Sequence, residues 1–282
     1  MNKKSLSLVL VLVLFILAVL PPASAAHADS NPPPQKENFS KWPDFGEDQI
    51  WRFYGVNGNG SNVSVNGALP FDNSTIEITP DKELRFIQVY DTDFDAEYPF
   101  QYNNVFMIGF QGYRPTVERD IVWSFDMKLD ANIYGTTGFF IEPEDTFAAD
   151  GSVAKPFNFF GVSYSGGQNI NAGVSCSDVV DFAIVSQTPI AEVDTFAWNT
   201  YEIRFHLVDS ETVEATISID GTEVCQSTRA NYGDTEVQIW LDNNQVLFDP
   251  TSPLGYVLSF GNEETPQTVL FDNIQVKAES VH

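Results

Sequence analysis

Hydrophobic and polar residues alternate along most of the chain. The alternation is clearest in three segments, Ile121–Leu129, Tyr201–Leu207 and Val213–Ile219, where apolar residues take every second position and mostly polar residues lie between them. A period of two places all the apolar side chains on one face of an extended backbone. Each of these segments is therefore predicted to be a half-buried β-strand.

Further strands are predicted from shorter apolar or alternating runs, at Leu84–Tyr90, Val105–Gly112, Thr137–Ile141, Phe157–Tyr164, Glu236–Leu241, Gly255–Phe260 and Thr268–Lys277. The connections carry turn-forming residues, as at Asn57–Gly60, Ser165–Gly167, Asp220–Gly221 and Asp242–Asn244. No stretch sustains the period of an amphipathic helix. So many strands without a helix predict an all-β fold, an antiparallel β-sandwich or jelly roll.

The first 28 residues have the pattern of a secretory signal peptide. Lys3 and Lys4 precede an apolar run from Leu6 to Leu20, and two sites of small residues follow at Ala23–Ala25 and Ala26–Ala28. A membrane anchor is the competing interpretation, but the run is shorter than the roughly 20 residues that a spanning helix needs. We therefore expect a secreted protein with no membrane span after cleavage.

The remainder of the chain is expected to form one domain. Residues 29–45 contain the proline run of Asn31–Pro34 and predict a flexible lead-in. Residues 46–279 show no second break in composition and no internal repeat, and sandwiches of this size commonly form a single domain.

The composition narrows the classes of partner. The chain carries a formal net charge of −25 and has a pI near 4.1, which argues against nucleic-acid binding and against docking on an anionic membrane. Only three histidines occur, so a zinc site built from clustered imidazoles is nearly excluded. Hydrophobic residues make up 43% of the chain, including 23 Phe, which is enough for a packed core.

The chain contains two cysteines, Cys176 and Cys225. In a protein that enters an oxidising compartment, a pair of cysteines predicts one disulfide. Two buried free thiols are the alternative.

Two segments resemble a known superfamily. Trp198–Ile203 and Val213–Gly221 are similar to the WxxYxI and VxVDG hairpin of concanavalin A-like lectin/glucanase domains, which include laminin-G-like and family-16 glycoside hydrolase-like sandwiches. Val269–Val276 is similar to their last strand. The resemblance implies a concanavalin A-like jelly roll. It implies no single function, because this superfamily contains lectins, carbohydrate-binding modules, glycoside hydrolases and lyases.

The hydrolase motif of that superfamily, Glu-x-Asp-x-(x)-Glu on one strand, is not found. Glu118–Asp120 and Glu192–Asp194 both lack the third carboxylate. Glu142 and Glu144 form a denser acidic cluster directly after a predicted strand. Three interpretations of this cluster stay open: a solvated turn, a metal or glycan loop, and a catalytic pair of carboxylates.

Carboxylates also recur at every second position from Asp91 through Asp93 and Asp95 to Glu97. Calcium favours six to eight oxygen ligands, and such a loop supplies several of them. A solvated acidic face is the other interpretation. The sequence requires no cofactor, and calcium is the one metal that it suggests.

The segment Glu236–Asp242 is the most informative predicted strand. Its alternation places Val237, Ile239 and Leu241 on one face, and Gln238, Trp240 and Asp242 on the other. An exposed Trp flanked by an amide and a carboxylate is typical of sugar recognition, since the ring stacks on a pyranose and the polar groups bond its hydroxyls. A loop covering Trp240 is the alternative. The further candidates for the same surface are Tyr134, Asn158 and Tyr164.

The sequence thus favours a secreted carbohydrate-binding protein whose partner is a glycan or polysaccharide. A polysaccharide-degrading glycoside hydrolase or lyase is the second interpretation, because the resembled fold includes many. A structural or adhesion module stabilised by calcium is the third. Binding is preferred to catalysis because the catalytic strand motif is missing.

Overall fold

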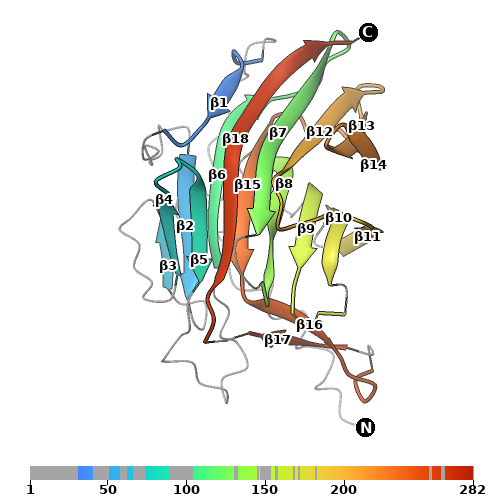
Figure 1. Cartoon of the computed structure of the whole chain (residues 1–282). Coiled ribbons are helices and arrows are strands. Elements are labelled where there is room, and N and C mark those ends of the chain that lie inside the picture. Colours follow the sequence, from blue (N-terminus) through green and yellow to red (C-terminus); the bar gives the residue numbers. More distant parts are fainter. Residues whose placement is uncertain are drawn as a thin grey trace.

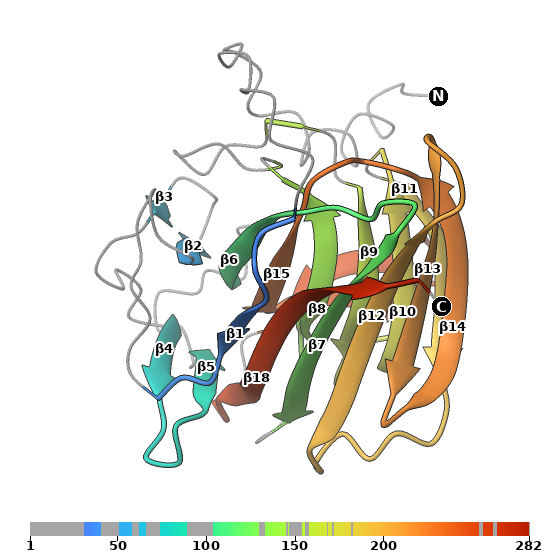
Figure 2. The same cartoon turned by 90° about the horizontal axis from the view of Figure 1, so that it is seen from above.

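The computed structural model describes residues 31–40, 51–57, 62–65, 74–88, 104–129, 133–144, 146, 154–155, 158–167, 169–170, 172–181, 183–253, 256–261 and 264–281. Two large antiparallel sheets pack face to face (Figure 1, and seen from above in Figure 2). These residues contain strands and no helix, so none of them forms a helix that could cross a membrane.

One sheet, here called sheet A, has eight strands. Seven follow the order β14-β13-β12-β7-β18-β5-β4, and β1 pairs with β18 beside them. Their bounds are β1 Gln35–Glu37, β4 Ser74–Ile78, β5 Leu84–Gln88, β7 Arg119–Leu129, β12 Asn199–Leu207, β13 Thr212–Ile219, β14 Thr222–Ala230 and β18 Gln267–Ser280.

The opposing sheet, sheet B, also has eight strands, in the order β11-β10-β9-β8-β15-β6-β2-β3. Their bounds are β2 Trp51–Asn57, β3 Asn62–Val65, β6 Asn104–Tyr113, β8 Thr136–Pro143, β9 Phe159–Ser165, β10 Gly173–Val180, β11 Ala183–Ile190 and β15 Thr235–Asp242. A separate hairpin joins β16, Asn244–Phe248, to β17, Tyr256–Phe260.

The core lies between the two sheets and follows the predicted alternation. In β13, buried and half-buried residues alternate from Thr212 to Ile219. Aromatic rings meet across the gap: Phe139 of β8 lies 5.4 Å from Tyr201 of β12, and Phe160 of β9 lies 6.4 Å from Phe205 of β12. The period of two therefore selects which face of each strand enters the core.

The predicted strands are confirmed. Each of the ten overlaps an observed strand: β5, β6, β7, β8, β9, β12, β13, β15, β17 or β18. Eight of the described strands lie outside the predicted segments, namely β1, β2, β3, β4, β10, β11, β14 and β16.

Part of the expected lead-in is not a free segment. Gln35–Glu37 forms β1 and pairs with Ile274–Val276 of β18. The hydroxyl of Tyr113 donates a hydrogen bond of 2.5 Å to the carbonyl of Pro33, which ties the residues before β1 to the end of β6. Residues 1–30 lie outside the described part of the chain, so the signal peptide stays a prediction.

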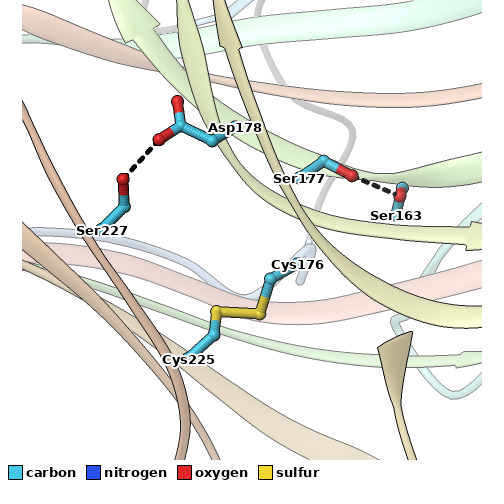
Figure 3. The surroundings of a disulfide bond; sticks show 6 residues. All are labelled: Ser163, Cys176, Ser177, Asp178, Cys225 and Ser227. Atoms are coloured by element: carbon cyan, nitrogen blue, oxygen red, sulfur yellow. Dashed lines mark hydrogen bonds between the residues drawn. A yellow bond between two sulfur atoms is a disulfide. The ribbon is translucent and has the colours of Figure 1, made fainter. Parts of the chain in front are cut away.

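The predicted disulfide is confirmed. Cys176 of β10 and Cys225 of β14 are joined, with their Cα atoms 6.6 Å apart. The bond links sheet B to sheet A at the edge where β10, β11 and β14 lie together (Figures 2 and 3). No free cysteine remains in the chain.

Candidate functional site

Strand β15 presents the two faces that its sequence predicts. Val237, Ile239 and Leu241 belong to the core cluster, whereas Gln238 and Trp240 do not. We call the face of sheet B that is turned away from the core its outer face. Every residue of β15 is nevertheless buried, on both faces. The outer face along this strand is therefore covered.

The expectation that Trp240 is exposed is wrong. Trp240 is only 5% exposed. Its ring stacks on Phe140 of the neighbouring strand at 4.1 Å between centroids, and its indole Nε1 donates to the hydroxyl of Thr136 over 3.1 Å. Trp240 is thus an anchored member of a larger ring cluster and not an open platform.

That cluster is a row of three rings across three adjacent strands. Phe140 of β8 stacks on Trp240 of β15 on one side and on Phe159 of β9 on the other, the latter at 3.7 Å between centroids. Phe140 and Phe159 are both partly exposed, in contrast to Trp240. We call Phe159, Phe140 and Trp240 the aromatic row. Its two phenylalanines are the rings through which the row reaches solvent.

Two glycines give the aromatic row its space. Gly138 is paired with Trp240, and a Cβ there would lie 3.0 Å from the Trp240 ring and 2.1 Å from a backbone carbonyl. Gly161 is paired with Phe140, and a Cβ there would lie 2.9 Å from that ring. The Trp240 ring therefore lies over β8 at Gly138, and the Phe140 ring lies over β9 at Gly161. This placement brings successive rings into stacking distance.

Small polar side chains lie beside the aromatic row, and Ser163, Ser177 and Gln238 among them are buried. Ser163 of β9 and Ser177 of β10 share a hydrogen bond of 2.9 Å, drawn in Figure 3. Ser163 lies in the register row of Gly138 and Trp240, and Ser177 in that of Gly161 and Phe140. Within this part of the outer face, the two partly exposed phenylalanine rings are therefore what a ligand can contact, and an aromatic ring can stack on the apolar face of a ligand.

Two glutamates lie opposite each other on β8 and β15, farther along the outer face of sheet B. Glu142 of β8 is directly opposite Glu236 of β15 in the strand register, and both are buried. Gln111 of β6 donates a 2.6 Å hydrogen bond to Glu236. Directly opposed residues in an antiparallel pair have Cβ atoms about 4.5–5.5 Å apart. The register therefore places the two side chains next to each other, and the sequence pattern did not identify Glu236 as the partner of Glu142.

Glu144 lies apart from that pair. Its backbone NH donates to the carbonyl of Asp234 over 2.9 Å, and its carbonyl accepts a bond of 2.6 Å from the Lys155 ammonium. The sequence-predicted pair Glu142 and Glu144 is thus divided between the strand and the turn that follows it.

Asp242 and Tyr134 have structural contacts. One carboxylate oxygen of Asp242 accepts hydrogen bonds from the backbone NH and hydroxyl of Thr136 and from the backbone NH of Asn244, at 2.9–3.0 Å. Tyr134 is buried, and its carbonyl accepts a 2.8 Å bond from Gln245. Both residues hold the end of sheet B where β8 begins and β15 ends.

The remaining predicted ligand residues lie elsewhere. Tyr164 packs against the core cluster, so it does not join the outer face, and burial raises the pKa of its hydroxyl. Asn158 accepts hydrogen bonds from the backbone NH of Asp181 and, over 3.2 Å, from the hydroxyl of Tyr232. It therefore braces the connection between β14 and β15.

The predicted calcium ligands Asp91, Asp93 and Asp95 fall outside the described residues, so this site stays a prediction. Within the described ranges no group of three or more His, Cys, Asp and Glu side chains is arranged to hold a metal ion.

The outer face of sheet A carries an ionic cluster. Arg204 binds Glu279 at 2.8 Å and Asp120 at 3.1 Å, and Asp120 also lies 2.8 Å from the His206 ring. Partial burial acts to lower the pKa of Arg204, but its hydrogen bonds to Glu279 and Asp120 outweigh this and raise it. Hydrogen bonds from Lys277 and Arg204 in turn lower the pKa of Glu279. The cluster joins β7, β12 and β18. His206 is therefore a surface residue with a structural contact to Asp120.

Comparison with solved structures identifies the fold. The chain resembles a β-glucanase of Bacillus licheniformis with a TM-score of 0.51 and 12% identity, over 88% of this chain and 99% of that one. It resembles a β-1,3-1,4-glucanase from a mouse hindgut metagenome at 0.50 and 12%, over 87% and 99%, and the catalytic domain of a laminarinase from Thermotoga petrophila at 0.50 and 13%, over 88% and 97%.

No known protein family and no curated protein sequence matches the chain. Likeness at such low identity establishes the fold alone. The fold is a concanavalin A-like jelly roll, as the resemblance of Trp198–Ile203 and Val213–Gly221 implies.

Proposed function

We propose that this protein binds carbohydrate with the partly exposed rings of the aromatic row. The observation that carries the proposal is the stacked series Phe159, Phe140 and Trp240, in which Phe159 and Phe140 are partly exposed. Pyranose rings have apolar faces that stack on aromatic rings and hydroxyls that bond to polar side chains. The similarity of the fold to three glucanases supports a carbohydrate as the ligand.

Retention on polysaccharides tests this proposal. The purified protein is run in native gels containing soluble β-1,3-glucan, β-1,3-1,4-glucan or an acidic polysaccharide, beside Phe140→Ala and Phe159→Ala. Because a central aromatic anchor contributes about 2 kcal/mol or more, we expect each variant to lose roughly 30-fold or more in affinity for the polysaccharide that retains the wild type.

Phe196→Ala is the matched control. Phe196 is 63% exposed and lies beside sheet A, where the carbonyl of Thr195 accepts a hydrogen bond from Leu129. This variant should be retained like the wild type, and circular dichroism should show that all three variants fold. Retention that survives both Phe140→Ala and Phe159→Ala would move the binding site away from the aromatic row.

Catalysis is the second candidate, and the opposed pair Glu142 and Glu236 favours it. Retaining glycoside hydrolases hold their two carboxyl groups about 5–5.5 Å apart, one donating a proton to the leaving oxygen and the other attacking the sugar. Both side chains here are buried, which is why binding is proposed first.

Product release distinguishes catalysis from binding. Incubation with the same polysaccharides should yield new reducing ends if the pair hydrolyses a glycan, and unsaturated products if the protein is a lyase. Glu236→Gln should abolish either product, whereas Glu118→Gln, at an exposed turn, should not. Retention without any product would leave binding as the function.

We also propose that the protein is secreted. The signal-like pattern of residues 1–28 supports this, as does the disulfide, because such bonds persist in oxidising compartments. Sequencing the amino terminus of protein recovered from the medium tests it, with the mature chain expected to begin after Ala25 or Ala28.

A further inference from the structure

The turn that follows β1 contains an asparagine in the tripeptide pattern Asn-x-Ser/Thr. Four such tripeptides, or sequons, occur in the chain, at Asn38–Ser40, Asn59–Ser61, Asn62–Ser64 and Asn73–Thr75. In secreted proteins this pattern is the acceptor sequence for N-linked oligosaccharides. Of the four, Asn38–Ser40 is the sequon whose three side chains lie in the described part of the chain.

The middle residue of this sequon is buried, and the two residues that define it are exposed. Phe39 is 0% exposed, and its ring lies 6.5 Å from that of Trp51 in the core. Asn38 and Ser40 both face solvent. The φ of Phe39 is 49°, an uncommon value for a bulky residue, and the buried ring holds the backbone in this turn. The fold therefore presents Asn38 and Ser40 together on the surface.

Three hydrogen bonds fix the turn around Asn38. One carboxylate oxygen of Glu37 accepts from the backbone NH groups of Asn38 and Phe39, at 3.0 and 2.7 Å. The side-chain oxygen of Asn38 accepts from the backbone NH of Ser40 over 3.2 Å, which makes an Asx turn. The side-chain nitrogen of Asn38 makes no hydrogen bond to the described part of the chain. The turn thus uses the amide oxygen and leaves the amide nitrogen available.

We propose that Asn38 is N-glycosylated, and this proposal rests on the proposed secretion of the protein. The donor is an oligosaccharide carried on a lipid pyrophosphate. A bond forms between Nδ2 of Asn38 and the first carbon of the oligosaccharide, the bond from that carbon to the pyrophosphate breaks, and the lipid pyrophosphate leaves as Nδ2 gives up one proton. The folded chain accommodates the product, because Asn38 is exposed and its nitrogen has no hydrogen bond for the sugar to displace.

The glycan would be attached away from the aromatic row. Asn38 directly follows β1, and β1 pairs with β18 of sheet A, whereas the aromatic row belongs to sheet B. Glycosylation of Asn38 should therefore leave polysaccharide retention by the aromatic row unchanged.

Mass spectrometry of the secreted protein tests the proposal. The full chain is expressed in human cells, whose secretory pathway supplies such a donor, and is then treated with peptide N-glycosidase in heavy-oxygen water. This enzyme converts a glycosylated Asn to Asp and labels it with the heavy oxygen. We expect the label at Asn38 in most molecules. Asn231 is the internal control: it accepts from the backbone NH of Gly233 over 3.1 Å in the same kind of turn, but Gly233 replaces the Ser or Thr of a sequon. It should carry no label.

Three variants assign the glycan to this sequon. Asn38→Gln and Ser40→Ala should each remove one glycan from the intact mass, whereas Ser40→Thr keeps a hydroxyl and should retain it. Ser40→Ala preserves the Asn38 side chain and the backbone NH bonded to it, so it decides the question if Asn38→Gln does not fold.

The amino terminus of the same sample tests secretion separately. A chain that is cut after Ala25 or Ala28 but carries no label at Asn38 would overturn glycosylation alone. A chain that stays in the cell with residues 1–28 intact and Asn38 unlabelled would overturn both proposals.

Discussion

The hydroxyl of Ser227 donates a hydrogen bond to the carboxylate of Asp178, joining β14 of sheet A to β10 of sheet B (Figure 3). Two positions earlier on each strand, Cys225 and Cys176 form the disulfide. Two positions later on β14, Arg229 approaches the same aspartate. The edge of the sandwich is thus closed by one column of contacts, covalent, hydrogen-bonded and ionic in turn.

The first prediction concerns the covalent member of that column. Replacing Cys176 and Cys225 together by Ser should lower the free energy of unfolding by about 4 kcal/mol, because opening a loop of 49 residues gives entropy back to the unfolded chain. Denaturant unfolding measures the loss. Ser227→Ala, which removes one hydrogen bond to a buried carboxylate, should cost less, roughly 1.5–3 kcal/mol. A double variant as stable as the wild type would contradict this interpretation.

The second prediction concerns Trp240. Because the ring is buried, stacked on Phe140 and bonded to Thr136, Trp240→Ala should destabilise the protein by about 3–5 kcal/mol. Thermal and denaturant unfolding give the measurement. Trp198→Ala is the control: this ring is 38% exposed beside Lys128, and its loss should cost well under half as much. Equal losses would show that Trp240 contributes no more than a surface ring.

The sequence predicts most clearly those strands in which the apolar period is not interrupted. In β13 every second residue is apolar, and the strand is found where the alternation places it. In β10 and β14 the inward positions include Asp178, Ser227 and Arg229, which meet one another across the gap. These polar residues interrupt the apolar period. Neither strand was therefore predicted, although the disulfide between their cysteines was predicted correctly.

The aromatic row could be predicted only in part, for a different reason. The alternation in Glu236–Asp242 correctly separates the two faces of β15, but it does not say what covers the outer one. The stacking of Trp240 on Phe140 depends on the register between β8 and β15, and on the space above Gly138. Register between strands far apart in the chain is set by the whole sheet. The glycines at positions 138 and 161, each within a strand, are the local signal of close ring approach.

The third prediction concerns calcium. If Asp91, Asp93 and Asp95 bind the ion in the native state only, millimolar calcium should raise the melting temperature above that measured with EDTA. Magnesium at the same concentration controls for screening of the large negative charge. Asp93→Asn should reduce the calcium-specific part of the shift. Identical melting curves in calcium and EDTA would contradict calcium binding by the native protein.

The fourth prediction concerns the loss of stability in alkaline solution. Burial raises the pKa of Tyr113 from 10.0 to about 12. The folded protein therefore holds this proton more tightly than the unfolded chain does. The contribution of Tyr113 is complete below pH 10 and is lost as the pH rises from 10 towards 12, where the unfolded chain ionises first. Its hydrogen bond to Pro33 breaks with that ionisation, so the segment before β1 should be released together with it.

Tyr113→Phe separates this residue from the other tyrosines. Below pH 10 the variant should be less stable than the wild type by about 1 kcal/mol, the value of one hydrogen bond. Above pH 10 it should lose less stability, and the two free energies of unfolding should converge. Tyr201, whose pKa is also raised by burial and by the charge of Asp220, should still titrate in the variant. Denaturant unfolding at closely spaced pH values, with tyrosinate absorbance followed in parallel, gives both curves. Parallel losses of stability in wild type and variant would assign the alkaline transition to other groups.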